Sequence, residues 1–446
     1  MGNESPSGGA WLSGGESERA TPCISSSVLA TALARNSGED HLPGKGYCGR
    51  LSAMVTEERK LSMRHRVLAM TVVVAALLLT WGLATVTAVP VQEGLPTGAP
   101  ASQASRDARR AEVQSLLPAV RGASLTASAT PVPQIEVMLG AVVSATLAQT
   151  VGDLSGEWPV LIEGQWYTIT TRNTYSGGPI EKAVAYAGER FAEMGLDVEY
   201  HRWNASVAPN VIAELEGALY PEEVVILSAH LDSYNRDSTS ELAPGADDNA
   251  SGVAAVLAGA EILSEHAWGR TLRFALWTGE EQGTLGSEVY ARRSSGLGEE
   301  ILAVVNLDMI GWDGVGEPDM DLHANQDVLG SLTLAELFSD VVRLYDLELV
   351  PEIIAEGTNR SDHASFWNEG YAAVLGIEDF YPSYYHDFNP YYHTDQDRLA
   401  YLDLDYFTEM ARAAVGTVAH LGCLVENGPC RWQWYLPLVV RAIASR

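Results

Sequence analysis

Apolar residues follow two different spacings along residues 134–421, and the alternation of these spacings predicts helices interleaved with strands. Apolar side chains from Ile180 to Met194 recur at helical spacing and stop at Gly195, which is typical of an amphipathic helix. Val224–Ser228 and Ile301–Leu307 are instead continuous apolar runs, typical of strands that are covered on both faces. Further helices are predicted at Ile135–Val151, Gly252–Leu263, Glu288–Arg293, Leu332–Tyr345 and Leu402–Leu421, and further strands at Val198–Arg202, Val211–Leu215 and Thr271–Trp277. This order predicts an α/β fold, a three-layer sandwich whose mostly parallel, mixed central sheet carries helices on both faces.

The segments before residue 134 differ in composition from the rest of the chain. Residues 1–62 are rich in Gly, Ser and charge, and we expect them to be disordered or absent from the mature protein. Residues 63–88 combine a basic start with an uncharged apolar run over 67–88 that ends in small residues, the pattern of a secretory signal peptide. That run is also long enough to anchor the chain in a membrane, and both interpretations place the remainder outside the cytosol. Residues 89–133 are predicted to be a linker or propeptide, 134–422 a folded domain, and 423–446 a C-terminal tail.

The charge of the chain narrows the range of partners. Asp and Glu number 58 against 28 Lys and Arg, which gives a formal net charge of −30. Binding to phosphates needs a basic surface, so neither nucleic acid nor anionic lipid is an expected partner. The four cysteines, Cys23, Cys48, Cys423 and Cys430, form no C-x-x-C pair, which argues against thiolate metal sites. In an exported protein Cys423 and Cys430 can close a small disulfide loop, and two unpaired thiols are the alternative.

Acidic residues and one histidine follow the ends of three predicted strands. These residues are, in chain order, His230 and Asp232, Glu280 and Glu281, and Asp308. In open α/β sheets, ligands bind beyond the carboxyl ends of the strands, so these side chains are expected to converge. Two further motifs supply the same residue types, Asp247 in Gly-Ala-Asp-Asp-Asn-Ala-Ser-Gly and His393 in Tyr-Tyr-His-Thr-Asp-Gln-Asp.

Neutral imidazoles and carboxylates are ligands of catalytic zinc, and two zinc ions about 3.5–4 Å apart can share one carboxylate. Such a pair needs five protein ligands and a separate general base, and the chain offers His230, Asp247, Glu280, Glu281, Asp308 and His393. Asp232 can hold the outer ring nitrogen of His230. Each residue alone has an ordinary structural explanation, such as a turn for Asp247-Asp248 beside Gly245. Their joint occurrence at strand ends points to a two-metal site.

These motifs resemble those of the di-zinc aminopeptidases of the bacterial leucyl aminopeptidase type, a family that also contains glutamate carboxypeptidase and glutaminyl cyclase. The resemblance covers roughly residues 134–421, and its most specific motifs are Gly245–Gly252 and Thr278–Glu281. It implies a fold of the zinc exopeptidase type, with residues 134–422 as the catalytic domain. The ligands it implies are His230 and Asp308 for one zinc ion, Glu281 and His393 for the other, and Asp247 as the bridge.

The same resemblance implies the catalytic groups. Glu280 would be the general base, and Tyr392 would stabilise the oxyanion. Ser361 would support the last histidine ligand, and a cis peptide bond would follow the bridging residue, between Asp247 and Asp248.

The predicted function is that of a secreted metallo-exopeptidase with two Zn²⁺ per chain, an aminopeptidase that removes apolar N-terminal residues from peptides. Its partners would be peptide substrates, and a membrane only if residues 67–88 are retained as an anchor. Alternatives within the family are a carboxypeptidase, which needs arginines for the substrate carboxylate where only Arg360 lies close to a motif, and a glutaminyl cyclase, which needs a single zinc ion. A non-catalytic surface binding domain would require broken ligand motifs, and these motifs are complete. The sequence leaves the oligomeric state open.

Overall fold

The computed structural model describes residues 130–237, 242–380 and 387–425, which all belong to one unit, Pro96–Arg446. The segment 1–62, the predicted signal peptide or anchor at 63–88, most of the predicted linker and the tail beyond residue 425 lie outside the described residues. The organisation expected for these segments therefore stays a prediction.

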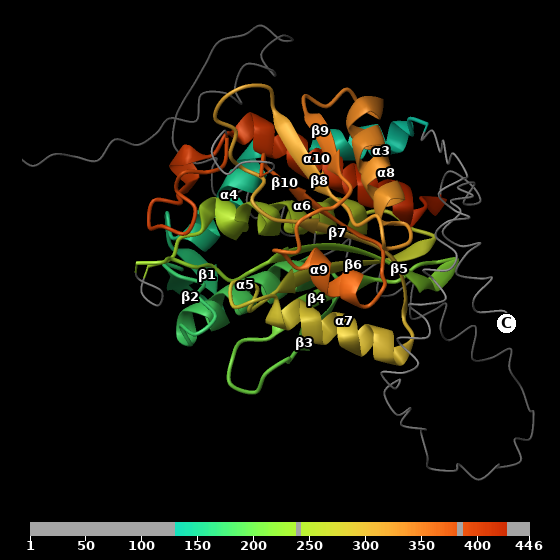
Figure 1. The fold of residues 1–446 in the computed structure, drawn as a ribbon. Coiled ribbons are helices and arrows are strands. Elements are labelled where there is room, and N and C mark those ends of the chain that lie inside the picture. Colours follow the sequence, from blue (N-terminus) through green and yellow to red (C-terminus); the bar gives the residue numbers. More distant parts are fainter. Residues whose placement is uncertain (1–129, 238–241, 381–386, 426–446) are drawn as a thin grey trace, which may run out of the picture. The chain divides into compact units, whose positions relative to one another are not determined.

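An eight-stranded sheet forms the centre of the domain, in the order β3-β4-β6-β5-β7-β10-β8-β9 (Figure 1). Strands β6, β5, β7 and β10 are parallel to one another, whereas β4 runs antiparallel to β6 and β8 antiparallel to β10. The strands are β3 (Asp197–His201), β4 (Asn210–Leu215), β5 (Tyr220–His230), β6 (Arg270–Trp277), β7 (Glu300–Leu307), β8 (Asp319–His323), β9 (Val350–Ile354) and β10 (Ala373–Ile377). A separate small sheet pairs β1 (Val160–Ile162) with β2 (Gln165–Tyr167). The mixed, mostly parallel sheet predicted from the sequence is confirmed.

Alternate side chains of β5 enter two separate cores. Val225 and Leu227 belong to the larger core, which also holds buried side chains of α3, α4, α5, α6, α8 and α10. Val224 and Ile226 belong to a smaller core that includes side chains of α7 and α9. The helices are α3 (Pro133–Ala141), α4 (Ser144–Ser155), α5 (Gly178–Glu193), α6 (Gly252–Ser264), α7 (Leu285–Leu297), α8 (Ser331–Leu344), α9 (His363–Asn368) and α10 (Leu404–Gly422), with single turns η1 (Ala246–Ser251) and η2 (Leu399–Tyr401). Helices therefore cover both faces of the sheet, which explains the continuous apolar runs of its central strands.

The single helix predicted over Ile135–Val151 is wrong. The segment forms α3 and α4, which are separated by extended backbone at Val142 and Val143 and meet at an angle of 47°. Two consecutive β-branched residues favour extended backbone, and this preference interrupts an otherwise apolar helical pattern. Within the described residues no single helix is long and apolar enough to span a membrane, although this bent pair passes on length and composition together.

The apolar pattern along the sequence does not predict the strands β8, β9 and β10. Each has five residues, and only β10 is buried throughout. Such short segments carry too few residues for a periodicity to be recognised. β10 matters for the site because it lies beside β7, and the segment after it leads towards His393.

Candidate metal centre

The carboxyl ends of β5, β6 and β7 bring the predicted site residues together. His230 is the last residue of β5, Asp308 directly follows β7, and Glu280 and Glu281 lie in the turn between β6 and α7. His393 comes from the segment between β10 and α10. Parallel strands that are neighbours in the sheet end at the same edge, so three distant stretches of sequence deliver their polar side chains to one place.

Two groups of side chains at this edge have the composition of metal sites. In the first group, His230 Nε2 lies 3.1 Å from Asp308 Oδ1 and 3.3 Å from Asp248 Oδ1. In the second, His393 Nε2 lies 3.0 Å from Asp248 Oδ2 and 3.0 Å from Glu281 Oε2. Within each group the candidate ligand atoms all lie within 4.8 Å of one another. Asp248 belongs to both groups, with one oxygen directed at each.

This arrangement corrects the sequence prediction by one residue, because the shared carboxylate is that of Asp248 and not that of Asp247. Asp247 instead accepts hydrogen bonds from the Gly311 N–H, at 2.8 Å, and from Asn389 Nδ2, also at 2.8 Å. The cis peptide bond is likewise one residue later than predicted, at Asp248–Asn249. Non-helical backbone angles at Asp248 and Asn249 turn the two neighbouring carboxylates in different directions, and the order of residues alone does not reveal this turn.

The backbone around Asp248 is fixed by a third aspartate. Asp397 accepts the N–H of Asp247 at 2.9 Å with one carboxylate oxygen and the N–H of Asp248 at 3.0 Å with the other. Asp397 is buried and belongs to the same His-Thr-Asp-Gln-Asp motif as His393. One motif therefore supplies a candidate ligand and the group that holds the shared aspartate in place.

Asp232 contacts His230 in a different way from the one expected. The outer ring nitrogen of His230, Nδ1, donates to the main-chain carbonyl of Asp232 at 3.0 Å, while the Asp232 carboxylate is 3.9 Å away. This bond fixes the neutral tautomer with a free lone pair on Nε2, which is the atom that faces Asp248 and Asp308. The carboxylate itself accepts the N–H groups of Glu280, at 3.2 Å, and Glu281, at 3.3 Å. Asp232 thus positions side chains of both groups.

The charges of the site are out of balance without a cation. Burial raises the pKa of Glu281 to about 8 and that of Glu280 well above its ordinary value, because each carboxylate would otherwise be ionised among other buried acids. Burial works against protonation of His230, but Asp308 and Asp248 outweigh it and raise its pKa. Glu281 Oε1 is also buried without a hydrogen-bond partner among the described residues. Imidazole nitrogens, carboxylate oxygens and a surplus of buried negative charge together fit divalent zinc.

Of the two further residues that the resemblance implicated, Tyr392 packs against His393, whereas Ser361 is bonded to Asn306. The Tyr392 ring stacks on His393 with a centroid distance of 3.7 Å and also contacts Phe388. Burial, together with Asp248, raises the pKa of Tyr392, so its hydroxyl stays protonated and can donate. Ser361 accepts a hydrogen bond from Asn306 Nδ2 at 2.9 Å, and within the described residues no hydrogen bond joins it to His393.

The structure also shows the contacts of two arginines to which the sequence analysis assigned no role, Arg172 and Arg236. Arg236 donates from Nη2 to the Tyr392 carbonyl at 2.6 Å and from its main-chain N–H to the His393 carbonyl at 3.1 Å. Arg172 is fully buried beneath the site and donates to main-chain carbonyls of the loops that carry His230 and Asp248. Thr171-Arg172 is one of the segments that resemble the di-zinc aminopeptidases, but the residue types do not indicate what Arg172 contacts, and the fold supplies that information.

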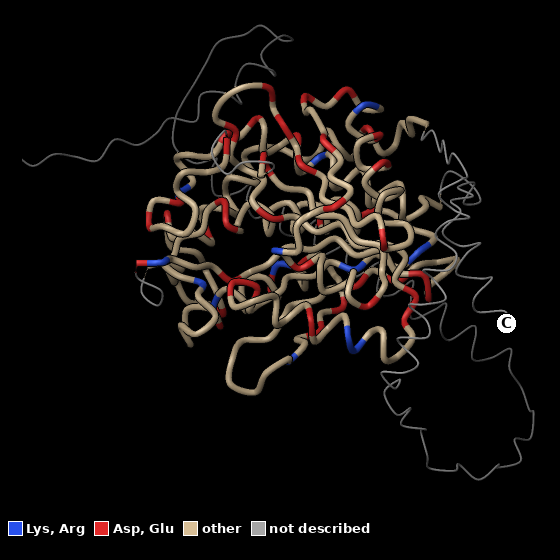
Figure 2. Tube along the Cα trace, in the orientation of Figure 1, with Lys and Arg blue, Asp and Glu red and all other residues tan. Residues whose placement is uncertain are grey.

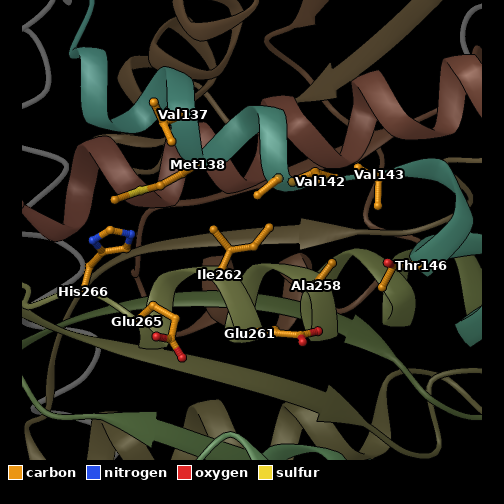
Figure 3. A pocket seen from close by; sticks show the side chains of 11 residues that line it. Val137, Met138, Val142, Val143, Thr146, Ala258, Glu261, Ile262, Glu265 and His266 are labelled. Atoms are coloured by element: carbon orange, nitrogen blue, oxygen red, sulfur yellow. The ribbon is translucent and has the colours of Figure 1, made fainter. Parts of the chain in front are cut away.

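The distribution of charged residues and one hollow elsewhere in the domain were compared with the candidate metal site. Acidic residues are spread over the described chain and outnumber basic ones (Figure 2). A hollow of about 400 Å³ lies between α3, α4 and α6 and is lined by Val137, Met138, Ile262, Glu261 and His266 among others (Figure 3). None of its lining residues belongs to either candidate ligand group.

Known proteins share this domain. Residues 210–418 match peptidase family M28. A probable leucine aminopeptidase of Trichophyton verrucosum (strain HKI 0517) is 34% identical over 224 residues, which cover 48% of this chain and 57% of that protein. The chain therefore spans just over half the length of this curated relative. The solved LapA aminopeptidase of Legionella pneumophila shares the fold with a TM-score of 0.56 and 21% identity, over 68% of this chain and 76% of that one. BSAP, a zinc aminopeptidase from Bacillus subtilis, has a TM-score of 0.53 and 15% identity, over 65% of this chain and 97% of that one.

Proposed function

We propose that this chain, whose residues 210–418 form a peptidase family M28 domain, is an aminopeptidase that holds two zinc ions. The observation that carries the proposal is the position of Asp248, whose two oxygens each face one histidine, with Asp308 completing one group and Glu281 the other. Proteins use a shared carboxylate of this kind to hold two metal ions side by side. The leucine aminopeptidase name of the curated relative supports a preference for an apolar N-terminal residue.

In this proposal His230, Asp308 and Asp248 hold one zinc ion, and His393, Glu281 and Asp248 hold the other. Bound there, zinc supplies a Lewis acid and lowers the pKa of a coordinated water. The remaining steps belong to the chain's own residues. Glu280, held by its main-chain bond to Asp232, accepts a proton from the attacking water and returns it to the leaving amine nitrogen.

The substrate is held by charge and by hydrogen bonding. Carboxylates of the metal site near Asp308 would hold the free α-ammonium group of a peptide, which an acetylated or internal residue lacks. The protonated hydroxyl of Tyr392 is available to donate to the developing oxyanion. This combination favours removal of a residue from the N-terminus over endopeptidase or carboxypeptidase cleavage.

The direct test is metal content measured together with substrate choice. Purified protein is expected to contain about two zinc ions per chain and to cleave leucine p-nitroanilide, with activity lost after chelation and restored by zinc. N-acetyl-leucine p-nitroanilide should be inert. Equal rates on the acetylated substrate, or cleavage only from the carboxyl end of blocked peptides, would overturn the aminopeptidase assignment. A metal-free protein without activity would instead favour a non-catalytic binding domain.

We also propose that the enzyme acts outside the cytosol after removal of residues 63–88. The basic start and apolar run of that segment support this proposal, and so does the disulfide bond made by Cys423, since disulfides persist in oxidising compartments. N-terminal sequencing of exported protein should find a start after residue 88. Recovery of residues 63–88 in the membrane fraction would favour the anchor.

A further inference from the structure

Arg172 is a fully buried arginine whose guanidinium group, within the described part of the chain, donates its hydrogen bonds to main-chain carbonyls. Nε donates to the Leu231 carbonyl at 2.7 Å, and Nη2 donates to the Gly245 carbonyl at 2.8 Å. Nη1 donates to the carbonyls of Leu154, at 2.8 Å, and Pro244, at 2.6 Å. A planar guanidinium presents its donors in a fixed fork, so these bonds set the relative positions of the three segments that supply the carbonyls.

Two of those segments carry the candidate ligands. Leu231 lies between His230 and Asp232 at the end of β5, and Gly245 begins the turn that holds Asp248. The approach is close, because a Cβ atom built on Gly245 would lie 3.1 Å from Arg172 Nη2. The main chain of Arg172 adds to the connection, since its N–H donates to Ser233 Oγ at 3.1 Å and its carbonyl accepts the Ser233 N–H at 3.3 Å. One side chain therefore ties the first histidine to the shared aspartate.

The positive charge of Arg172 also interacts with the buried acids of the site. Burial lowers its pKa to about 10, which still leaves the guanidinium protonated at neutral pH. The carboxylates of Asp397, Asp248, Asp232 and Glu281 act on it through space and favour its charged form. Before any metal binds, Arg172 thus provides a fixed positive charge beneath a cluster of buried acids.

We propose that Arg172 is a positioning residue that arranges His230 and Asp248 for metal binding, and that the zinc affinity of both sites depends on its hydrogen-bonded fork. The inference rests on the proposed function, since it assumes that these residues hold zinc. Among the described residues, the hydrogen bonds of the Arg172 guanidinium all go to main-chain carbonyls, so it acts through the backbone that carries the ligands. Residues that hold and orient the ligands of a metal ion, without binding the ion themselves, typically contribute about 10–100-fold to metal affinity.

The experiment compares zinc affinity in Arg172→Lys, Arg172→Gln and a matched pair of control variants. Arg270 is a suitable control because it is also buried on the central sheet, where it donates to Glu223 at 2.7 Å and to the Leu421 carbonyl at 2.7 Å. Arg270→Lys and Arg270→Gln should lower thermal stability without changing zinc affinity. Zinc dissociation constants are measured on folded full-length protein by competition with a chromophoric chelator, with folding checked by circular dichroism.

We expect about a tenfold weaker zinc affinity for Arg172→Lys, which keeps the charge but loses the fork, and up to about a hundredfold for Arg172→Gln. The kcat of these variants should fall at limiting zinc and recover in excess zinc, with KM unchanged, a recovery that a purely structural defect would not show. If Arg172→Gln does not fold, Arg172→Lys decides the question. Wild-type zinc affinity in folded Arg172→Lys, or an equal loss in the Arg270 variants, would overturn the inference. Failure of the wild-type protein to bind zinc would overturn the proposed function instead.

Discussion

Replacing Asp248 with Asn removes the charge that both groups of candidate ligands share, and we expect Asp248→Asn to weaken the binding of both zinc ions. Asp248 places Oδ1 3.3 Å from His230 Nε2 and Oδ2 3.0 Å from His393 Nε2. An amide keeps the shape of the side chain but replaces one of these oxygens with a nitrogen that cannot bind a metal ion. The remaining neutral oxygen is a poorer ligand than a carboxylate oxygen.

The size of the effect follows from the number of ligands. Zinc sites with four ligands bind with about 10–16 kcal/mol, or roughly 3 kcal/mol for each ligand, so losing one ligand weakens binding by about a hundredfold. Because Asp248 serves both groups, the zinc ion that faces the amide nitrogen should lose affinity by about this factor, and the other, which keeps a neutral oxygen, should lose less. Loss of a ligand such as Asp308, which belongs to one group only, should affect mainly one of the two ions.

Asp247→Asn is the matched control, because it makes the same chemical change one residue earlier. The Asp247 carboxylate accepts hydrogen bonds from Gly311 and Asn389 and contacts no histidine of the two groups. Disturbing these buried bonds should lower the free energy of unfolding by about 1–3 kcal/mol while both zinc ions are retained. Zinc titrations by calorimetry, with metal content after dialysis, distinguish the variants. Two tightly bound ions in Asp248→Asn, together with zinc loss in Asp247→Asn, would refute the assignment of the shared ligand.

Three further outcomes are expected. Glu280→Gln should keep both zinc ions but lose about 10²–10⁴-fold in kcat, and normal turnover with reduced zinc would reverse its role. Gly245→Ala should destabilise the fold by more than Gly298→Ala in urea unfolding, because both positions have positive φ but only the new Cβ at 245 collides with its surroundings; equal effects would contradict this. Burial lowers the pKa of His420 to about 4, so the unfolded chain binds the extra proton first as the pH falls. Stability should therefore decrease between pH 6.5 and 4, by roughly 1–2 kcal/mol at pH 5, and His420→Gln should reduce that slope in unfolding measured against pH.

The central strands and most helices could be predicted because their burial dictates their composition. Val224–Ser228 and Ile301–Leu307 are apolar throughout, since the sheet carries helices on both faces, and β5 and β7 contain these runs. The break between α3 and α4 depends on the preference of two valines for extended backbone within a strongly apolar stretch. Helical periodicity is judged over many residues, so it does not reveal a break at two of them. Edge strands such as β9 are not predicted, because their partial exposure leaves no distinct pattern of apolar and polar residues.

The candidate site was predictable as a set of residues but not as a set of contacts. His230, Glu281 and Asp308 come together as expected, since strand order places their positions at one edge of the sheet, and His393 joins them from the segment between β10 and α10. The choice between Asp247 and Asp248 depends on which way the chain turns between Ala246 and Ser251, and two adjacent aspartates are chemically equivalent in a sequence. The partner of the outer nitrogen of His230 was missed for a similar reason, because a main-chain carbonyl leaves no trace in the residue types.

The buried acids of the site differ in the partners of their carboxylate oxygens. Asp397 accepts two main-chain N–H groups, and Asp232 accepts two more together with the Thr174 hydroxyl. These hydrogen bonds occupy the oxygens of both carboxylates, although burial still raises the pKa of each. The oxygens of Asp248 meet only imidazole nitrogens, and Glu281 has one oxygen on His393 and another without a partner within the described residues. Other buried acids, such as Asp362, also lack hydrogen-bond partners among the described residues, so the combination of carboxylates with imidazole nitrogens, rather than the number of acids, marks the place where zinc is proposed to bind.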